Sequence, residues 1–500
     1  MLKLLTCLTL SVLLAVAPIC AGANVIDLPR LGDPADNAMS PAQERELGSE
    51  VVAELYANDY VVEDPELEDY VNTIGYKLVS HSVTQPLWPM TFFVVADDRI
   101  NAFALPGGFI GINIGTLLAA ANESELAGVM GHELAHVTQR HIARAEEDTK
   151  VANALTWAAV LAAILAGSVA NPNLVIGAIG AGQAINYQRQ VNYTRAHEQE
   201  ADRIGIQTMA AAGFDPNGMA NFFIRLEQQT RLYGGRLPEI LLTHPLNTTR
   251  IAEARARIAE LPKITHKDSM DFSLLQARAR VMSVDRESQA TDYFGGELGA
   301  GHDTPAVRYG YAYALLQLSR IDEAQKVLQP TLEQFPHQAQ IALLHAHLQL
   351  AAQQTAPSLA SYAEVIKLYP RYAPAILDYA DALITAGQPD KARQLLLSSQ
   401  TIVGTRMLFS KLLAEAARDM GNNPESAYQM ANYLYLRGDD GNALAQLDAG
   451  LRLPNLSGQD KARLIARRQE IRARLPANWR PSDTSGRFTG NAATMESLRP

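Results

Sequence analysis

The chain has 500 residues, with a hydrophobic share of 47%, an aromatic share of 7% and a charged share of 19%. That length predicts about three domains, and that apolar content excludes wholesale disorder. The 43 Lys and Arg against 53 Asp and Glu give a net charge of −10, and no basic cluster offsets it. We therefore expect no nucleic-acid partner, because a phosphate backbone would be repelled.

Residues 1–23 have the pattern of a secretory signal peptide. Lys3 precedes an apolar run from Leu4 to Ile19, and Ala21-Gly22-Ala23 is a small-x-small cleavage site, so we expect the mature chain to begin at Asn24. An uncleaved membrane anchor is the alternative, but the run of about 16 residues is short for a bilayer span.

Both cysteines, Cys7 and Cys20, fall inside this segment. The mature chain would then have neither a free thiol nor a disulfide. A lipid anchor on Cys20 is disfavoured, because the bulky Ile19 precedes it. An exported, cysteine-free chain of this size predicts the bacterial periplasm.

Between residues 41 and 145 the pattern predicts helices and a small sheet. Two helices are expected over 41–80, the first capped by Ser40 with Gln43 as its capping-box partner. Strands are expected at 90–95 and 109–114, with a turn at 106–108 before the second. A long helix is then expected from Glu123 to about Ala145.

The segment 151–188 contains no charged residue. Three readings stay open: a hairpin that spans a membrane, a hairpin that touches a membrane surface or a partner, and a hairpin in the protein core. The second limb, Leu174 to Ile185, is short for a span. Peripheral membrane contact through 151–188 is thus one of the open interpretations.

After Pro262 the sequence repeats with a period of 34 residues, which is the tetratricopeptide period. Small residues stand at two frame positions, and proline follows the second helix of a unit; these residues are Ala312, Ala346 and Ala380, then Ala324, Ser358 and Ala392, then Pro336 and Pro370. Small residues let paired helices approach closely. A further unit is expected at Ala431 and Ala443, after a single extra helix over 407–419.

The segment Gly131-His132-Glu133-Leu134-Ala135-His136 holds the H-E-x-x-H pattern inside the predicted long helix. Residues four apart lie on one helical face, so His132 and His136 can bind one metal ion while Glu133 polarises a bound water. Two surface histidines are the alternative interpretation. His141 would lie on the opposite side of a continuous helix, so we expect it to face away.

A catalytic zinc also needs a third protein ligand. Glu198 and Asp202 lie four apart on one helical face, so one carboxylate can bind the metal while the other orients a metal-binding histidine without touching the metal. We expect Glu198 to be the ligand and Asp202 the holding group. Glu200 is disfavoured as the ligand because Ile204 would be its partner, and we expect Glu200 and His197 to be solvated.

Together these motifs resemble the M48 family of zinc metallopeptidases. His132-Glu133-x-x-His136 with Glu198-x-x-x-Asp202 carries the resemblance, and Asn101-Ala102-Phe103-Ala104 before Pro106-Gly107-Gly108 is similar to the family's strand leading to the active-site helix. The match extends across about residues 40 to 260. The exported start and the repeats resemble the periplasmic members of the family. The resemblance implies a mainly α fold: a zincin-like domain with a small β-sheet, cupped by an α-solenoid of tetratricopeptide repeats.

The same resemblance draws attention to Thr243-His244-Pro245-Leu246 and to Arg250. It implies that His244 lies on a plug loop and can occupy the fourth zinc position, from which it must be displaced before substrate binds. It also implies that Arg250 stabilises the oxyanion or the site. Without the family, His244-Pro245 is a loop dipeptide.

These residues predict a zinc endopeptidase. One Zn²⁺ held by His132, His136 and Glu198 would lower the pKa of its water, and Glu133 would accept the proton as the hydroxide attacks a peptide carbonyl. An extended substrate is expected to pair as an added strand along Phe109 to Asn113. Such pairing predicts unfolded or stalled chains as substrates, which the resemblance narrows to outer-membrane β-barrel proteins, with the barrel assembly machinery as a partner of the repeats.

The expected domains are a signal peptide (1–23), a metalloprotease domain (24–265), a repeat domain (266–475) and a flexible tail (476–500). A function of another class stays open. In it the chain is a non-proteolytic scaffold or chaperone whose repeats dock the outer-membrane assembly machinery, with the metal site mostly closed. A third interpretation, an integral membrane protease, needs spanning helices that the sequence scarcely has.

Overall fold

The computed structural model describes residues 36, 39–149, 184–232, 238–245, 248–284, 286–404 and 406–475. The predicted signal peptide and the predicted tail lie outside these residues. So does the uncharged segment, except for residues 184–188, which begin a helix. Among the helices that are described, none combines the length and the apolar character that a membrane crossing requires.

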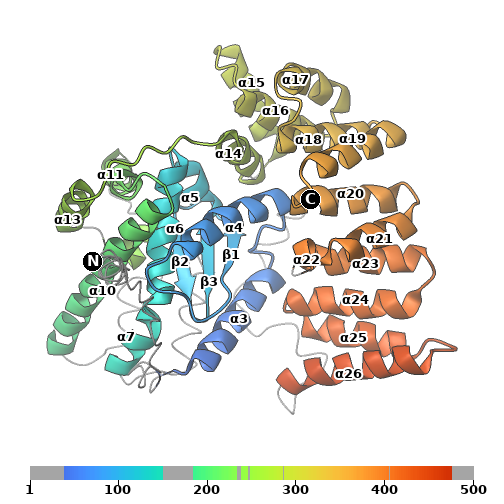
Figure 1. Ribbon diagram of the computed structural model, residues 1–500, viewed down its shortest axis with the longest axis horizontal. Coiled ribbons are helices and arrows are strands. Elements are labelled where there is room, and N and C mark those ends of the chain that lie inside the picture. Colours follow the sequence, from blue (N-terminus) through green and yellow to red (C-terminus); the bar gives the residue numbers. More distant parts are fainter. Residues whose placement is uncertain are drawn as a thin grey trace, which may run out of the picture.

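The N-terminal part of the chain is a helical layer around one small sheet (Figure 1). Its elements in chain order are α3 (Pro41–Ala57), α4 (Pro65–Ser80), β1 (Thr91–Val95), β2 (Ala102–Leu105), β3 (Phe109–Asn113), α5 (Ile114–Ala119), α6 (Glu123–Thr138), α7 (His141–Thr149), α10 (Ala184–Ala211), α11 (Asn217–Leu232), α12 (Glu239–Thr243) and α13 (Thr248–Ala259). The two opening helices and the two predicted strands are confirmed. The predicted capping box is also present, because Ser40 and Gln43 bond to each other's backbone N–H.

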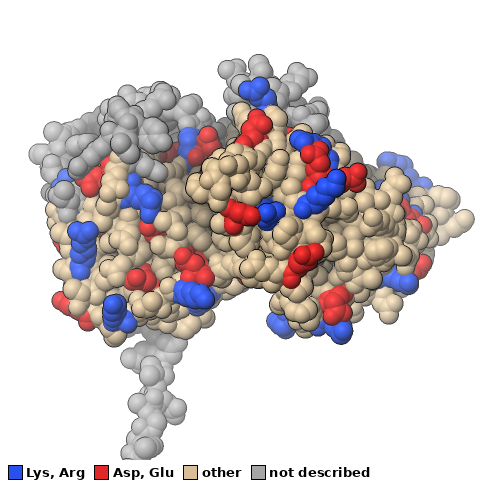
Figure 2. Space-filling view, turned by 90° about the horizontal axis from the view of Figure 1, so that it is seen from above, with Lys and Arg blue, Asp and Glu red and all other residues tan. Residues whose placement is uncertain are grey.

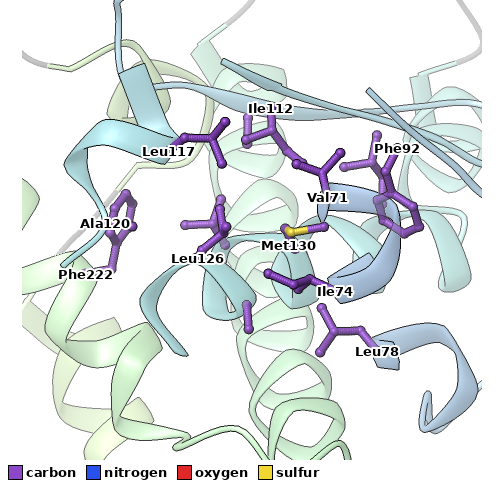
Figure 3. Close-up of a cluster of buried hydrophobic side chains, with 14 of the residues drawn as sticks. Val71, Ile74, Leu78, Phe92, Ile112, Leu117, Ala120, Leu126, Met130 and Phe222 are labelled. Atoms are coloured by element: carbon purple, nitrogen blue, oxygen red, sulfur yellow. The ribbon is translucent and has the colours of Figure 1, made fainter. Parts of the chain in front are cut away.

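The sheet has the strand order β1-β3-β2, with β1 parallel and β2 antiparallel to β3. The predicted turn between β2 and β3 is confirmed. Gly107 and Gly108 take φ values of 77° and 94° there, a region that favours glycine. One continuous core joins α4, the sheet, α6 and α11 (Figure 3). It contains Ile74, Phe92, Ile112, Met130 and Phe222, and this packing fixes the metal-motif helix against the sheet.

The prediction that a substrate strand adds along Phe109 to Asn113 is wrong. β3 is the central strand, so both of its edges are already paired, with β1 and with β2. The two edge strands of the described sheet are β1 and β2. The outer edge of β1 is already bonded to residues 60–62, through the Val61–Val95 bridge and the Val62 N–H that donates to the Val94 carbonyl, which leaves the β2 edge for an added strand. Strand order depends on contacts between distant segments, so the alternation of residues within β3 could not reveal it.

The predicted long helix is also wrong in its extent. α6 ends at Thr138, and α7 begins at His141 after Arg140, whose φ is +52°. The Arg140 side chain is buried, and it donates to Glu44 and to the carbonyl of Met39. These distant contacts hold the backbone in a left-handed conformation that interrupts the helix.

The C-terminal part is a curved stack of helix pairs beside the first part (Figure 1). Its helices are α14 (Met270–Met282), α15 (Glu287–Gly299), α16 (Pro305–Gln317), α17 (Ile321–Gln334), α18 (Ala339–Ala351), α19 (Thr355–Leu368), α20 (Ala373–Thr385), α21 (Pro389–Ser398), α22 (Gln400–Val403), α23 (Met407–Asp419), α24 (Asn423–Leu436), α25 (Asp440–Leu451) and α26 (Gly458–Arg474). The predicted repeats are confirmed. The six small residues of the 34-residue frame are all fully buried at 0% exposure.

The helix over 407–419 exists, but it is not an extra helix between units. Ala414 lies 34 residues after Ala380, and Ser426 lies 34 after Ala392, so α23 and α24 form the next repeat in phase. The Ser426 hydroxyl donates to the Ala414 carbonyl at 2.8 Å, as that of Ser358 does to the Ala346 carbonyl at 2.8 Å. The phase of the repeats is therefore unbroken through α24.

Arginines of the repeats bind an acidic stretch of the first part, from the end of α3 into α4. The pairs are Arg278 with Asp64 at 2.7 Å and Glu66 at 2.8 Å, Arg406 with Glu68 at 3.1 Å and with Asp69, and Arg437 with Glu63 at 3.1 Å and with Asp59. Arg278 is 5% exposed. It lies 34 residues before Ala312, so it occupies the repeat position at which the later repeats have alanine. Away from this joint, charges of both signs are interspersed over the face seen in Figure 2.

Glu123, the first residue of α6, joins the two parts at a second place. Its carboxylate accepts from Tyr70 Oη at 3.0 Å, from His266 Nε2 at 2.8 Å and from the Ser269 backbone N–H at 3.1 Å. Burial alone would raise the pKa of Glu123, but the hydrogen bonds from Ser269 and His266 outweigh it and lower that pKa.

We predict that Glu123→Gln lowers the free energy of unfolding by about 1.5–3 kcal/mol at neutral pH, because an amide nitrogen cannot accept these bonds. A carboxylate with a depressed pKa stabilises the fold above its unfolded pKa of 4.5, and this is lost as pH falls through the folded value. The difference between variant and wild type should therefore shrink in acid. Urea unfolding at pH 7 and at about pH 4 measures it. Glu364→Gln, at an exposed ion pair, is the control, and a difference that stays constant with pH would contradict the prediction.

Candidate metal centre

The motif helix α6 meets α10 where both have glycine. A Cβ on Gly205 would lie 3.1 Å from the backbone of Gly131 and of His132, which is tighter than ordinary contact. Glycine at this crossing therefore lets the two helix axes approach. The close approach brings Glu198 and Asp202 of α10 against the histidines of α6.

Four side chains from three segments converge at this crossing. His132, His136, Glu198 and His244 each offer a ligand atom, and these atoms all lie within 4.8 Å of one another. His132 Nε2 lies 3.0 Å from His136 Nε2 and 3.3 Å from Glu198 Oε2. His244 Nδ1 lies 2.9 Å from Glu198 Oε1. Two imidazoles and a carboxylate from paired helices are a donor set typical of catalytic metal sites.

Glu133 lies beside this cluster and is 1% exposed. Its Oε1 lies 3.4 Å from His244 Nε2. Its Oε2 is buried with no hydrogen-bond partner among the described residues. A buried carboxylate oxygen without a partner is costly unless a further group binds it, so the donor set and Glu133 together fit a metal ion with a polar ligand next to it.

Asp202 and Arg250 form a layer behind the ligands. Asp202 Oδ1 lies 2.9 Å from His132 Nδ1, the nitrogen that faces away from the cluster. Arg250 donates to Asp202 Oδ2 at 2.8 Å, lies 2.8 Å from Glu198 Oε2 and is 3% exposed. Because both carboxylates occupy its guanidinium, Arg250 stabilises the arrangement of the site rather than facing open space.

The buried charges shift each other's pKa values. Burial opposes a charge on His132, yet hydrogen bonds with Asp202 and Glu198 raise its pKa to about 10. Burial alone would raise the pKa of Glu198, but His244 and His132 hold it well below its usual range. Burial lowers the pKa of His136. A proton on His132 must therefore leave before its nitrogen can bind a metal.

His244 reaches the cluster at the end of the short helix α12. The segment is held by the Ile240 backbone N–H, which donates to the Ile100 carbonyl at 3.1 Å, and by Glu239, which lies 2.9 Å from Arg99. Ile240 is buried in the core. These contacts place the His244 ring between Glu133 and Glu198.

His141 does not face away, as the continuous helix had predicted. The break at Arg140 turns its ring back, so that His141 Nδ1 lies 3.0 Å from His136 Nδ1. The expectation that His197 is solvated is also wrong, and Glu200 is only partly exposed, with 27% of its side chain accessible. His197 is 6% exposed and stacks on His141, with ring centroids 4.2 Å apart, and Glu200 lies 3.2 Å from His141 Nε2. The sequence holds no local signal for this, because Arg140 interrupts the helix through Glu44 and Met39.

Comparison with known proteins agrees with this geometry. Residues 65–258 match the model of peptidase family M48, and residues 298–348 and 349–399 match that of the tetratricopeptide repeat. The chain is 34% identical over 465 residues to the beta-barrel assembly-enhancing protease of Escherichia coli K12, covering 91% of this chain and 93% of that protein. It is 38% identical over 335 residues to a putative protein of the same name from Vibrio cholerae, covering 66% and 68%.

A more distant relative is the mitochondrial metalloendopeptidase OMA1 of Schizosaccharomyces pombe, 29% identical over 192 residues, which cover 38% of this chain and 53% of that protein. The motif, the buried donors and these similarities lead to one conclusion: the chain belongs to peptidase family M48 and is a metallopeptidase with tetratricopeptide repeats.

Proposed function

We propose that this metallopeptidase is a zinc endopeptidase of the bacterial periplasm, exported by its signal peptide, that degrades unfolded or stalled outer-membrane β-barrel proteins and promotes the assembly of others. The observation that carries the proposal is the convergence of His132, His136 and Glu198 with Glu133 beside them. The substrate class is supported by the name of the relatives that match nearly the whole chain.

Zinc suits this donor set because two imidazoles and one carboxylate leave room for a further ligand. When bound, the ion supplies a water of lowered pKa and polarises the substrate carbonyl. Glu133 then takes the proton of the attacking water and returns it to the leaving amine. The buried Oε2 of Glu133, which has no partner among the described residues, is the atom available for that proton.

Asp202 and Arg250 prepare the ligands. Asp202 accepts a hydrogen bond from the Nδ1–H of His132 and so keeps Nε2 free for the metal. Arg250 neutralises Asp202 and orients Glu198. Their roles are to position ligands and not to take part in bond making.

His244 acts as a plug. Its two ring nitrogens face Glu198 at 2.9 Å and Glu133 at 3.4 Å, where a water would need to sit. The plug segment also bonds to the outer edge of β2, the edge along which we propose that substrate pairs. In the β2–β3 ladder the Asn113 N–H donates to the Asn101 carbonyl, so by alternation the outer edge carries the backbone groups of Ile100, Ala102 and Ala104.

The Ile100 carbonyl on this edge already accepts from Ile240 of the plug segment. A substrate strand that pairs with Ala102 and Ala104 would therefore run into the plug segment at Ile100, and pairing along the whole edge requires the plug segment to move. We place substrate pairing at the β2 edge, and not at the central strand β3.

The scaffold alternative also has an observation in its favour. His244 closes the site, and the repeats are joined to the first part by buried ion pairs, so the whole chain can act as one rigid docking body. In that reading the repeats bind the barrel assembly machinery. The segment 151–188, which lies outside the described residues apart from its end, stays a proposed site of peripheral membrane contact.

The first prediction for the metal centre concerns Asp202. Asp202→Asn should weaken zinc binding about 10- to 100-fold, because the amide cannot hold His132 as a carboxylate does. Competition with a chromogenic chelator on the metal-free protein measures this. Asp390→Asn, on an exposed repeat helix, is the matched control and should bind zinc as the wild type does.

The zinc affinity of the wild type and of Asp202→Asn should fall as pH falls, since protons compete with zinc for the histidines. Unchanged affinity in Asp202→Asn would show that Asp202 does not support the ligand.

The second prediction separates protease from scaffold. Glu133→Gln should keep one zinc per chain and the wild-type fold, and should reduce casein or barrel-protein cleavage about 10²- to 10⁴-fold. Metal analysis and cleavage rates test it. Retained cleavage would contradict the role of Glu133 as the base in peptide hydrolysis. Normal barrel assembly by the inactive variant would show that the scaffold role stands by itself.

The third prediction concerns the plug. His244→Ala should raise the rate of cleavage and keep zinc, because three ligands remain. Arg99→Ala should raise the rate less, by at most roughly fivefold, since the partly exposed ion pair with Glu239 contributes up to about 1 kcal/mol. Loss of zinc from His244→Ala would instead make His244 a structural ligand.

A further inference from the structure

The two ligand histidines on α6 have different partners on their outer nitrogens. His132 Nδ1 faces the carboxylate of Asp202 at 2.9 Å, whereas His136 Nδ1 faces the Nδ1 of another histidine, His141, at 3.0 Å. His141 is 3% exposed. The contact is therefore a part-buried nitrogen-to-nitrogen hydrogen bond, in which one ring must donate and the other must accept.

The direction of this bond follows from the inner nitrogen of His136. That atom, Nε2, lies 3.0 Å from His132 Nε2 and 3.4 Å from Glu198 Oε1, on the side of the donor cluster. A histidine that binds a metal through Nε2 carries its proton on Nδ1. His136 must then donate, so His141 accepts at Nδ1 and carries its own proton on Nε2.

The far side of His141 matches this tautomer. His141 Nε2 lies 3.2 Å from Glu200 Oε2, an oxygen that can only accept from it. Arg144 lies 3.0 Å from the same oxygen and balances the charge of Glu200. In both hydrogen bonds, from His136 to His141 and from His141 to Glu200, a donor thus faces an acceptor.

The fold also fixes the orientation of the His141 ring. His197 stacks on it with ring centroids 4.2 Å apart and an interplanar angle of 8°. The break at Arg140 sets the start of α7, and His141 is the first residue of that helix. The ring of His141 is therefore held by its stack on His197 and by the start of α7, as well as by the hydrogen bond to His136.

We propose that His141 is a positioning residue for the metal ligand His136: its Nδ1 accepts a hydrogen bond from the Nδ1–H of His136, and its Nε2–H donates one to Glu200. This inference rests on the proposed metal site and assigns that site a residue outside the H-E-x-x-H motif. A partner on the outer nitrogen fixes the tautomer and the ring of the ligand, and its loss typically weakens metal binding 10- to 100-fold.

The test compares zinc binding by the metal-free full chain of the wild type, His141→Phe and His141→Asn, by competition with a chelator. Phenylalanine keeps the stack on His197 and removes the acceptor, so zinc should bind 10- to 100-fold more weakly. The Asn side-chain oxygen can stand where Nδ1 of the histidine stood, so this variant should bind within about threefold of the wild type. Equal binding by His141→Phe and wild type overturns the inference, and so does equal weakening in both variants.

A second measurement needs no variant. In the zinc-loaded wild type with ¹⁵N-labelled histidine, NMR should show His136 protonated at Nδ1 and His141 protonated at Nε2. A His141 ring protonated at Nδ1 overturns the inference while leaving the zinc site in place. A wild type that binds no zinc overturns the proposed function itself and this inference with it, so the two failures are distinguishable.

Discussion

The close crossing of α6 and α10 is the constraint on which the site depends. A Cβ on Gly205 would lie 3.1 Å from the backbone of Gly131 and His132, which is tighter than an ordinary contact. Only at that separation can carboxylates one and two turns along α10 reach imidazoles on α6. The cluster of buried charges is then stabilised by mutual pairing, since each ion would be costly to bury by itself. The packing of α6 against α10 therefore also determines which side chains meet in the site.

Local periodicity was sufficient to find the residues at this crossing. His132 and His136, like Glu198 and Asp202, are four apart, and such spacing places two side chains on one helical face. The 34-residue period of the repeats was equally readable. In both cases the information lies within a few turns of the chain, or recurs along it.

What the sequence could not reveal depends on contacts between distant segments. The helix break at Arg140 comes from Glu44 and the Met39 carbonyl, and it reverses the direction in which His141 points. The central position of β3 comes from its pairing with β1 and β2. The fourth repeat was misplaced because Ala431 and Ala443 are also small and buried, although Ala414 and Ser426 keep the phase.

Arg278 shows how a repeat array becomes tied to its neighbour. It occupies the place where later repeats have alanine, and its guanidinium finds both of its counter-ions, Asp64 and Glu66, outside the array. Replacing Asp64 and Glu66 with neutral residues while keeping Arg278 would leave a buried cation without compensation, at a cost of several kcal/mol. Exchange of repeat units should therefore be tolerated least at this first unit, because its ion pairs are buried on both sides, whereas Arg406 and Arg437 of the later units pair with the more exposed Glu68 and Glu63.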